Sequence, residues 1–304
     1  MYMGAMDSHM TKTGARHVIL PERGLVKISG PEAKSFLNAL VSNDVEKVSP
    51  NQAVYAALLT PQGKFLFDFL IVESGDSLLL DCEGGRQSEL QRRLTLYKLR
   101  AKIDISDARA AFTIGAVFGD GALDAVGLPA QLGHVKPYGG GLVLVDPRLV
   151  ALGARVILPA EHAGAALEEA GIPLASAAEY DLHRLKLGVP DGSRDMAVDK
   201  ALLLEANFES LHGVDFAKGC YVGQELTART KHRGLLKKQL FVVRGADPLP
   251  EAETPVMLDG KEAGTMRSSQ GGLGLALLRL EQVDIARAEG RKLLAGESPI
   301  ELLA

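Results

Sequence analysis

Short apolar runs alternate with helical patterns along the first half of the chain. The runs lie at 24–30, 53–59, 64–72, 77–82, 102–106 and 112–118, and their length and composition predict β-strands. Residues 60–63, Thr-Pro-Gln-Gly, are typical of a turn and predict an antiparallel hairpin between the flanking strands. Apolar spacing predicts one helix after Pro31 and another around 90–97. Antiparallel pairs mixed with helices favour an α+β fold over a doubly wound parallel sheet.

The second half of the chain changes character near residue 240. Strands are predicted at 142–145 and 155–158, and a helix at 160–170. The next helix has the clearest start, because Ser176 and Glu179 form a Ser-x-x-Glu capping box. Beyond 240, short apolar runs are separated by glycines and acids without a helical period, which predicts a small all-β module.

Length and composition indicate an ordinary globular protein. The chain has 304 residues, 46% hydrophobic and 24% charged, which is enough for two or more domains. Residues 1–10 resemble an expression remnant, with a native start near Met10 or Thr11. No stretch approaches the roughly 18 apolar residues of a membrane span, so we expect a soluble cytoplasmic protein. A net charge of −4 argues against a protein that coats nucleic acid.

Basic residues are concentrated in two segments. Between 86 and 102 there are six basic residues and one acid, and between 218 and 244 there are seven basic residues and one acid. If the fold brings these segments together, they favour a small anionic ligand or one anionic partner surface. The alternative is that each is a solvated face of a helix or strand.

Cys220 is the strongest candidate for chemistry. It lies between two glycines in KGCYVGQE, residues 218–225, where the backbone has the freedom to present a thiol at the surface. The nearby cation of Lys218 favours the reactive thiolate. The alternative is a buried structural cysteine.

The sequence predicts no metal site. Cys82 is the only other cysteine, and neither the cysteines nor the seven histidines have metal-site spacing. A disulfide between Cys82 and Cys220 is a minor alternative.

These motifs together resemble the YgfZ-type folate-binding proteins, a family related to the glycine-cleavage aminomethyltransferase and to a mitochondrial iron-sulfur assembly factor. The octapeptide at 218–225 is similar to the family signature Lys-Gly-Cys-Tyr-x-Gly-Gln-Glu. Similar blocks follow in the family's order over nearly the whole chain, at 36–37, 43–45, 59–64, 188–190, 228–229 and 233–234.

The resemblance implies a three-lobed, aminomethyltransferase-like α+β fold around a channel that binds tetrahydrofolate, including polyglutamylated forms. Two interleaved α+β lobes would occupy residues 11–236 and a small β-barrel residues 237–304. Tyr180 stands where relatives have an aromatic residue that faces the folate. The chain has no tryptophan, and Arg23 lies near a position where relatives carry one. Asp81 is the candidate for the acid that aminomethyltransferases hold beside the folate.

The resemblance also implies roles for the motif residues. Cys220 and Lys218 are expected to form the reactive pair. Folate-binding candidates are Lys64, Tyr180, Tyr221, Gln224, Glu225 and Arg229, although Gln224 and Glu225 have the alternative role of tying the loop to Arg229. A cluster usually takes about four thiolate ligands, so Cys220 would have to share one with glutathione, a partner or a client.

The expected function is that of a tetrahydrofolate-binding accessory factor for assembly or repair of iron-sulfur clusters in client enzymes, including radical enzymes that modify tRNA. Its partners would be folate and client iron-sulfur proteins or cluster-assembly factors. Two alternatives remain. One is a folate-dependent aminomethyl or one-carbon transferase, and the other is a non-catalytic folate-binding adaptor in which Cys220 is inert.

Overall fold

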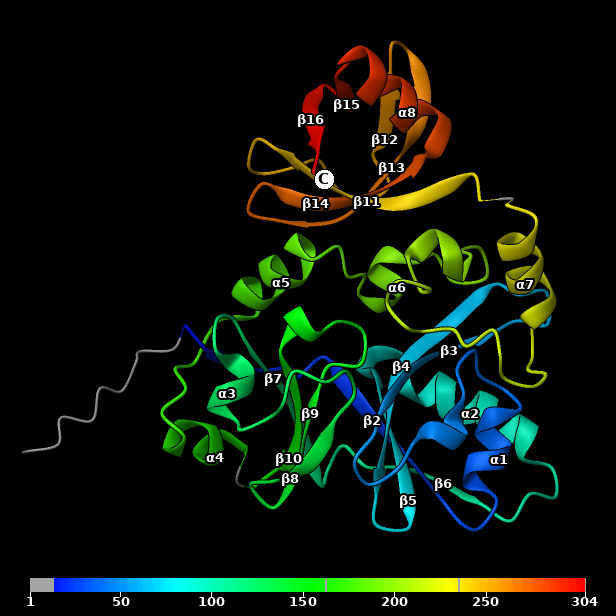
Figure 1. The fold of residues 1–304 in the computed structure, drawn as a ribbon, viewed down its shortest axis with the longest axis vertical. Coiled ribbons are helices and arrows are strands. Elements are labelled where there is room, and N and C mark those ends of the chain that lie inside the picture. The colour runs from blue at the N-terminus through cyan, green and yellow to red at the C-terminus, as the bar shows by residue number, and fades with distance from the viewer. Residues whose placement is uncertain (1–13, 162, 235, 304) are drawn as a thin grey trace, which may run out of the picture.

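In the part of the chain that the structure describes, the strands form two five-stranded antiparallel sheets and a closed six-stranded barrel (Figure 1). The computed structural model describes residues 14–161, 163–234 and 236–303, so the predicted expression remnant at 1–10 lies outside the described residues. Helices and strands mix in the two sheet-containing lobes, and the barrel forms the third lobe. The predicted three-lobed α+β fold is confirmed.

The first sheet has the strand order β3-β4-β5-β2-β6. Its strands are β2 (Arg23–Ser29), β3 (Val54–Leu59), β4 (Phe65–Ser74), β5 (Ser77–Glu83) and β6 (Asp104–Asp107). The predicted hairpin joins β3 to β4, and its turn is closed by a 2.8 Å hydrogen bond from the Gly63 amide to the Thr60 carbonyl.

The second sheet has the order β1-β7-β10-β9-β8 and interleaves with the first along the chain. Its strands are β1 (Arg16–Ile19), β7 (Phe112–Phe118), β8 (Val135–Tyr138), β9 (Gly141–Val145) and β10 (Ala154–Pro159). The chain begins in this sheet with β1, crosses to the first sheet for β2 to β6, and returns at β7. Apolar residues of both sheets, including Leu25, Leu79 and Ile157, pack into one shared cluster, so the two lobes form a common core.

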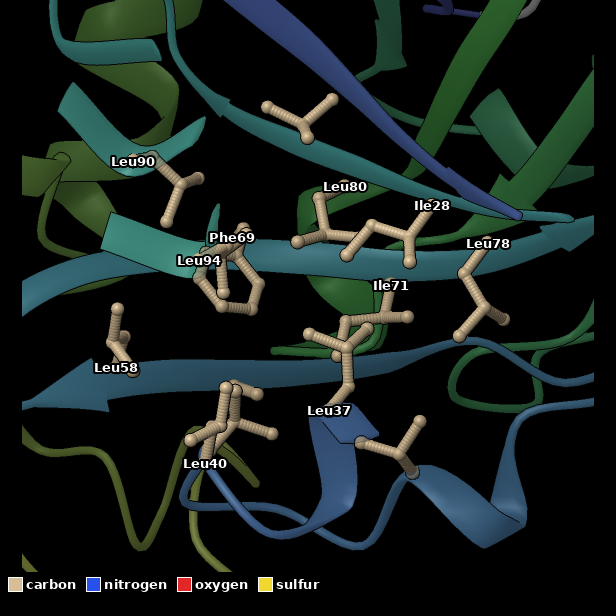
Figure 2. Packing of buried hydrophobic residues seen from close by; sticks show 14 of the residues in the cluster. Ile28, Leu37, Leu40, Leu58, Phe69, Ile71, Leu78, Leu80, Leu90 and Leu94 are labelled. Carbon is tan, nitrogen blue, oxygen red and sulfur yellow. The ribbon is translucent and has the colours of Figure 1, made fainter. Parts of the chain in front are cut away.

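Helices cover the outer face of the first sheet and bridge the lobes. Their bounds are α1 (Ala33–Asn38), α2 (Gln87–Lys98), α3 (Ala122–Ala125), α4 (Ala163–Glu169), α5 (Ala177–Lys186), α6 (Gly192–Asp195), α7 (Gln224–His232) and α8 (Leu280–Glu289), with short 3-10 helices η1 (Val45–Lys47), η2 (Gly84–Arg86), η3 (Val150–Leu152) and η4 (Leu203–Ala206). Leu37 of α1 and Leu90 and Leu94 of α2 meet strand residues such as Phe69 and Leu80 in a fully buried cluster (Figure 2). None of the described helices is long and apolar enough to cross a membrane.

Helices α5 and α6 lie between the barrel and the two sheets (Figure 1). The predicted capping box begins α5: the Ser176 hydroxyl accepts from the Glu179 amide, and the Glu179 carboxylate accepts from the Ser176 amide. Such a cap satisfies amides that a helix start leaves without partners. The cap therefore fixes where α5 begins, at the edge of the space between the three lobes.

The barrel has the order β11-β14-β13-β12-β15-β16. Its strands are β11 (Lys238–Gly245), β12 (Pro255–Leu258), β13 (Lys261–Gln270), β14 (Leu273–Arg279), β15 (Leu293–Ala295) and β16 (Ser298–Leu302). The prediction of an all-β module was wrong in one respect, because α8 follows β14. Val283 and Ala286 of this helix pack into the barrel core, and two buried positions are too few to show a helical period in the sequence.

Candidate functional site

Cys220 is exposed, in the loop that leads into α7. A side chain at the adjacent Gly219 would meet no atom within 4 Å, so the space beside the thiol is open. Cys82 is buried within β5, and both cysteines are free thiols. The alternatives of a disulfide and of a buried Cys220 are therefore wrong, and burial raises the pKa of Cys82 to about 12.

Lys218 anchors this loop to the end of α1. Its ammonium donates to the carbonyls of Asn38, Val41 and Asn43 at 2.8, 2.7 and 2.6 Å. It also lies 5.1 Å from the centre of the Tyr221 ring. Burial lowers the pKa of this ammonium to about 8, so it is still charged at neutral pH and all three donors are available. The cation predicted to assist the thiol is thus directed to backbone carbonyls.

A glycine pair fixes the other end of the loop. Gly63 has φ +77° and Gly223 has φ +81°, a region that side chains rarely adopt. A Cβ on Gly63 would lie 2.8 Å from the Gly223 carbonyl oxygen and 2.8 Å from the Leu226 Cβ. The hairpin turn of the first sheet and the cysteine loop, which are separate motifs in the sequence, therefore pack directly against each other.

The remaining residues of the motif make local contacts. The Gln224 side chain accepts from the Tyr221 amide at 3.2 Å, and Glu225 pairs with Arg229 one turn along α7 on the exposed surface. Tyr221 packs against the core below the loop, and burial raises the pKa of its hydroxyl. Lys231 pairs with Glu209. The Glu225–Arg229 pair matches the structural alternative considered for these residues.

A cavity of about 280 Å³ lies between β2, β10, α5 and the barrel. Tyr180 of α5 lines it, as expected for a ligand-facing aromatic residue. The other lining residues are Leu20, Glu22, Arg23, Arg148, Arg155, Ala177, Ala178, Asp181, Arg184, Pro190, Asp191, Arg194 and Gln270. Five arginines surround so small a space, so the cavity favours a ligand rich in hydrogen-bond acceptors. We call it the central cavity.

Buried ion pairs form the wall of the central cavity where the two sheets meet. Arg23 donates to Asp81 at 2.7 Å, so the residue near the missing tryptophan pairs with the acid singled out in the sequence. Arg148 makes a two-point pair with Asp146, at 3.0 and 2.8 Å. Both carboxylates are almost fully buried, and the neighbouring arginines hold the pKa of Asp146 below its usual range despite burial.

A second group of charges joins α5 to the barrel. Arg184 donates to Asp181 at 2.7 Å, to Asp195 at 2.6 Å and to the Ser268 hydroxyl of β13 at 2.6 Å. Asp195 in turn accepts from the Ser268 amide at 2.9 Å. Because the pairs are buried and fully hydrogen-bonded, they hold the barrel in a fixed orientation over the cavity.

Lys64 lines a different cavity, of about 420 Å³, under the barrel. Lys200, Lys238 and Arg267 also line it. Of the residues that the structure describes, Lys238 is the only basic residue of the two basic segments that lines either this cavity or the central one. The two segments do not come together around the central cavity, so the condition on which they would jointly hold an anionic ligand is not met there.

Of the five arginines of the central cavity, sequence reasoning singled out only Arg23 and missed Arg148, Arg155, Arg184 and Arg194. Arg155 interrupts the apolar strand β10 with a single charge. A charge inside an apolar strand was the signal in the sequence that pointed to this site, because a buried charge requires a partner. Within the described residues, no group of three or more metal-binding side chains comes together.

The fold is that of an aminomethyltransferase. The chain matches the crystal structure of glycine cleavage system aminomethyltransferase T from Bartonella henselae with a TM-score of 0.76, over 95% of this chain and 85% of that one, at 16% identity. Residues 237–303 match the family model of the CAF17 C-terminal β-barrel domain.

The sequence relatives define the family more closely. Mitochondrial iron-sulfur cluster assembly factor IBA57 of Homo sapiens is 35% identical over 284 residues, 87% of this chain and 77% of that protein. The Mus musculus protein of the same name is 34% identical over 286 residues, with the same coverage. The chain belongs to the IBA57 family of iron-sulfur cluster assembly factors. The narrower YgfZ-type assignment stays a prediction. The relatives are named as mitochondrial, and this finding contradicts the prediction of a cytoplasmic protein.

Proposed function

We propose that this protein supports assembly or repair of iron-sulfur clusters with Cys220 as a ligand or relay thiol. The observation that carries the proposal is an exposed thiol on a loop fixed at both ends, by Lys218 and by Gly223, in a chain of the IBA57 family. A fixed loop holds the sulfur at the surface at low entropic cost, where a second protein has access to it.

Because Cys220 is a single thiol, it needs ligands from a second molecule to hold a cluster. Clusters usually take about four thiolate ligands, and Cys220 has no second cysteine beside it, since Cys82 is buried in β5. The cluster, as cargo, would therefore be shared between Cys220 and thiolates of a cluster-assembly factor, a client protein or glutathione. We further propose that the clients include radical enzymes that modify tRNA.

Tetrahydrofolate is the proposed ligand of the central cavity. Tyr180 offers an aromatic surface, and five arginines offer donors for the carbonyl and carboxylate oxygens of a folate. The cavity volume of about 280 Å³ is near the lower end of ligand sites, so part of the folate would extend beyond it. When bound, tetrahydrofolate supplies a reduced pterin that carries one-carbon units.

Complementation in cells that lack this protein tests the role of the thiol. We expect that iron-sulfur enzyme activities in cells that express Cys220→Ala stay as low as in cells that lack the protein. The matched Cys82→Ala variant should restore these activities. Immunoblots establish that both variants accumulate to equal levels. Full restoration by Cys220→Ala contradicts the proposal and favours an adaptor with an inert thiol.

A further inference from the structure

In the described part of the chain, Arg155 is the one guanidinium lining the central cavity that has no hydrogen-bonded carboxylate. Its Nε lies 3.3 Å from Asp81 Oδ2 and its Nη2 lies 3.7 Å from Asp146 Oδ2, and neither contact has hydrogen-bond geometry. Its best contact is a 3.5 Å hydrogen bond from Nη2 to the Tyr180 hydroxyl. Among the described residues, no hydrogen-bond acceptor serves Nε or Nη1, and both atoms are buried.

The other four arginines of the cavity each have a hydrogen-bonded carboxylate. The hydrogen-bonded pairs are Arg23 with Asp81, Arg148 with Asp146, Arg184 with Asp181 and Asp195, and Arg194 with Asp181 and Asp191. On the wall between the two sheets, three guanidinium groups therefore share two carboxylates. Asp68, a further buried acid, accepts from the Tyr55 hydroxyl at 2.9 Å instead.

Burial makes this arrangement costly unless something else completes it. The Arg155 side chain is 4% exposed, and arginine does not give up its proton in proteins. Its unpartnered donors belong to a residue that lines the cavity, so a ligand there is in position to accept from them. The Arg155 Nη1 alone carries two unpartnered N–H groups, and a cationic donor binds a carboxylate or phosphate more strongly than it binds a neutral carbonyl.

We infer that Arg155 is the receptor of an oxyanion on the ligand of the central cavity. The inference rests on the proposed function in that it takes this cavity as the ligand site, but it holds for any ligand that brings an oxyanion. The glutamate carboxylates of tetrahydrofolate and inorganic phosphate both have this chemistry.

Calorimetric titrations of the full chain separate these sources. The probes are p-aminobenzoylglutamate, inorganic phosphate, tetrahydrofolate and tetrahydrobiopterin, a pterin without a carboxylate. We expect at least one anionic probe to bind the wild type and Arg155→Met to weaken it about 10- to 100-fold, as for loss of a charged hydrogen bond. Arg155→Lys keeps the charge but not the planar guanidinium, and should weaken binding less. The matched variant Arg267→Met, which removes a buried arginine of the barrel outside this cavity, should bind as the wild type does.

Thermal unfolding without ligand distinguishes a binding residue from a structural one. In Arg155→Met, Asp81 Oδ1 keeps Arg23 and Asp146 keeps Arg148, but the buried Asp81 Oδ2, which has no hydrogen-bond partner, loses the Arg155 cation 3.3 Å away. We therefore expect the melting temperature to fall by no more than about a degree or two. A structural ion pair would instead lower it by several degrees. If Arg155→Met does not fold, Arg155 is structural and the inference fails, and the Lys variant then measures what the charge alone binds.

Each result bears on one proposal or the other. Tetrahydrofolate binding that is equal in wild type, Arg155→Met and Arg155→Lys overturns the oxyanion receptor and leaves the folate proposal standing. Binding of phosphate through Arg155 without any binding of tetrahydrofolate supports the receptor and contradicts the folate proposal. Binding of tetrahydrobiopterin that depends on Arg155, or no binding of any anionic probe, overturns the receptor.

Discussion

The ammonium of Lys218 lies 2.6 Å from the carbonyl oxygen of Asn43, 175 residues earlier in the chain. This hydrogen bond and two more to the same turn hold the cysteine loop against the end of α1. The cation of the motif thus works through position: it determines where the thiol is presented, while Cys220 itself stays free for a partner.

Replacing Lys218 with Met should destabilise the protein. Three carbonyls would lose a charged donor in a half-buried site, at a cost of about 1–3 kcal/mol in the free energy of unfolding. The matched change Lys231→Met, which breaks an exposed pair with Glu209, should cost about 0–1 kcal/mol. Urea denaturation measures both. Equal small losses would show that Lys218 does not anchor the loop.

Gly63→Ala should be far more harmful than Gly260→Ala. Both glycines have nearly the same backbone angle, φ +77° and +78°, so the conformational penalty is shared. Only at Gly63 does the added methyl meet the Gly223 carbonyl and Leu226, whereas Gly260 faces open space. We expect an extra loss of about 1–3 kcal/mol for Gly63→Ala. If the two variants unfold at the same urea concentration, the contact between hairpin turn and cysteine loop is unimportant for stability.

Alkylation should select one cysteine. Cys220 is exposed, and Cys82 is buried with a pKa raised to about 12. Because the thiolate is the reacting form, iodoacetamide near neutral pH should modify Cys220 alone in the folded protein and both cysteines in urea. Mass spectrometry of the intact chain and of its peptides counts and locates the adducts. Modification of Cys82 without denaturant would contradict the described burial.

The folded protein should lose stability as the pH falls, because His183 resists protonation in the folded state. Its ring packs against Phe118 and lies 3.0 Å from the Ala151 carbonyl, and burial lowers its pKa below the ordinary 6.5, with a smaller contribution from Lys186. The unfolded chain then binds a proton that the folded chain resists, so stability is lost as pH falls below about 6.5. Urea midpoints at several pH values should show a shallower slope for His183→Gln. Identical slopes would exclude His183 as the source.

Local features of this chain were predictable and distant ones were not. The capping box of Ser176 and Glu179 needs only neighbours in sequence, and the hairpin at 60–63 needs only turn chemistry. The surroundings of Arg155 depend instead on Asp81 in the first sheet and Asp146 in the second, which only folding brings together. The three acceptors of Lys218 are likewise backbone atoms, which leave no mark in the sequence.

Titration of the purified protein with tetrahydrofolate under reducing conditions tests the central claim most directly. We expect saturable binding at one site per chain. Tyr180→Ala, which removes the aromatic wall of the central cavity, should weaken binding, and Tyr138→Ala, a tyrosine outside that cavity, should not. Absence of saturable binding by the wild type, or equal binding by Tyr180→Ala, would contradict the assignment of this cavity to tetrahydrofolate.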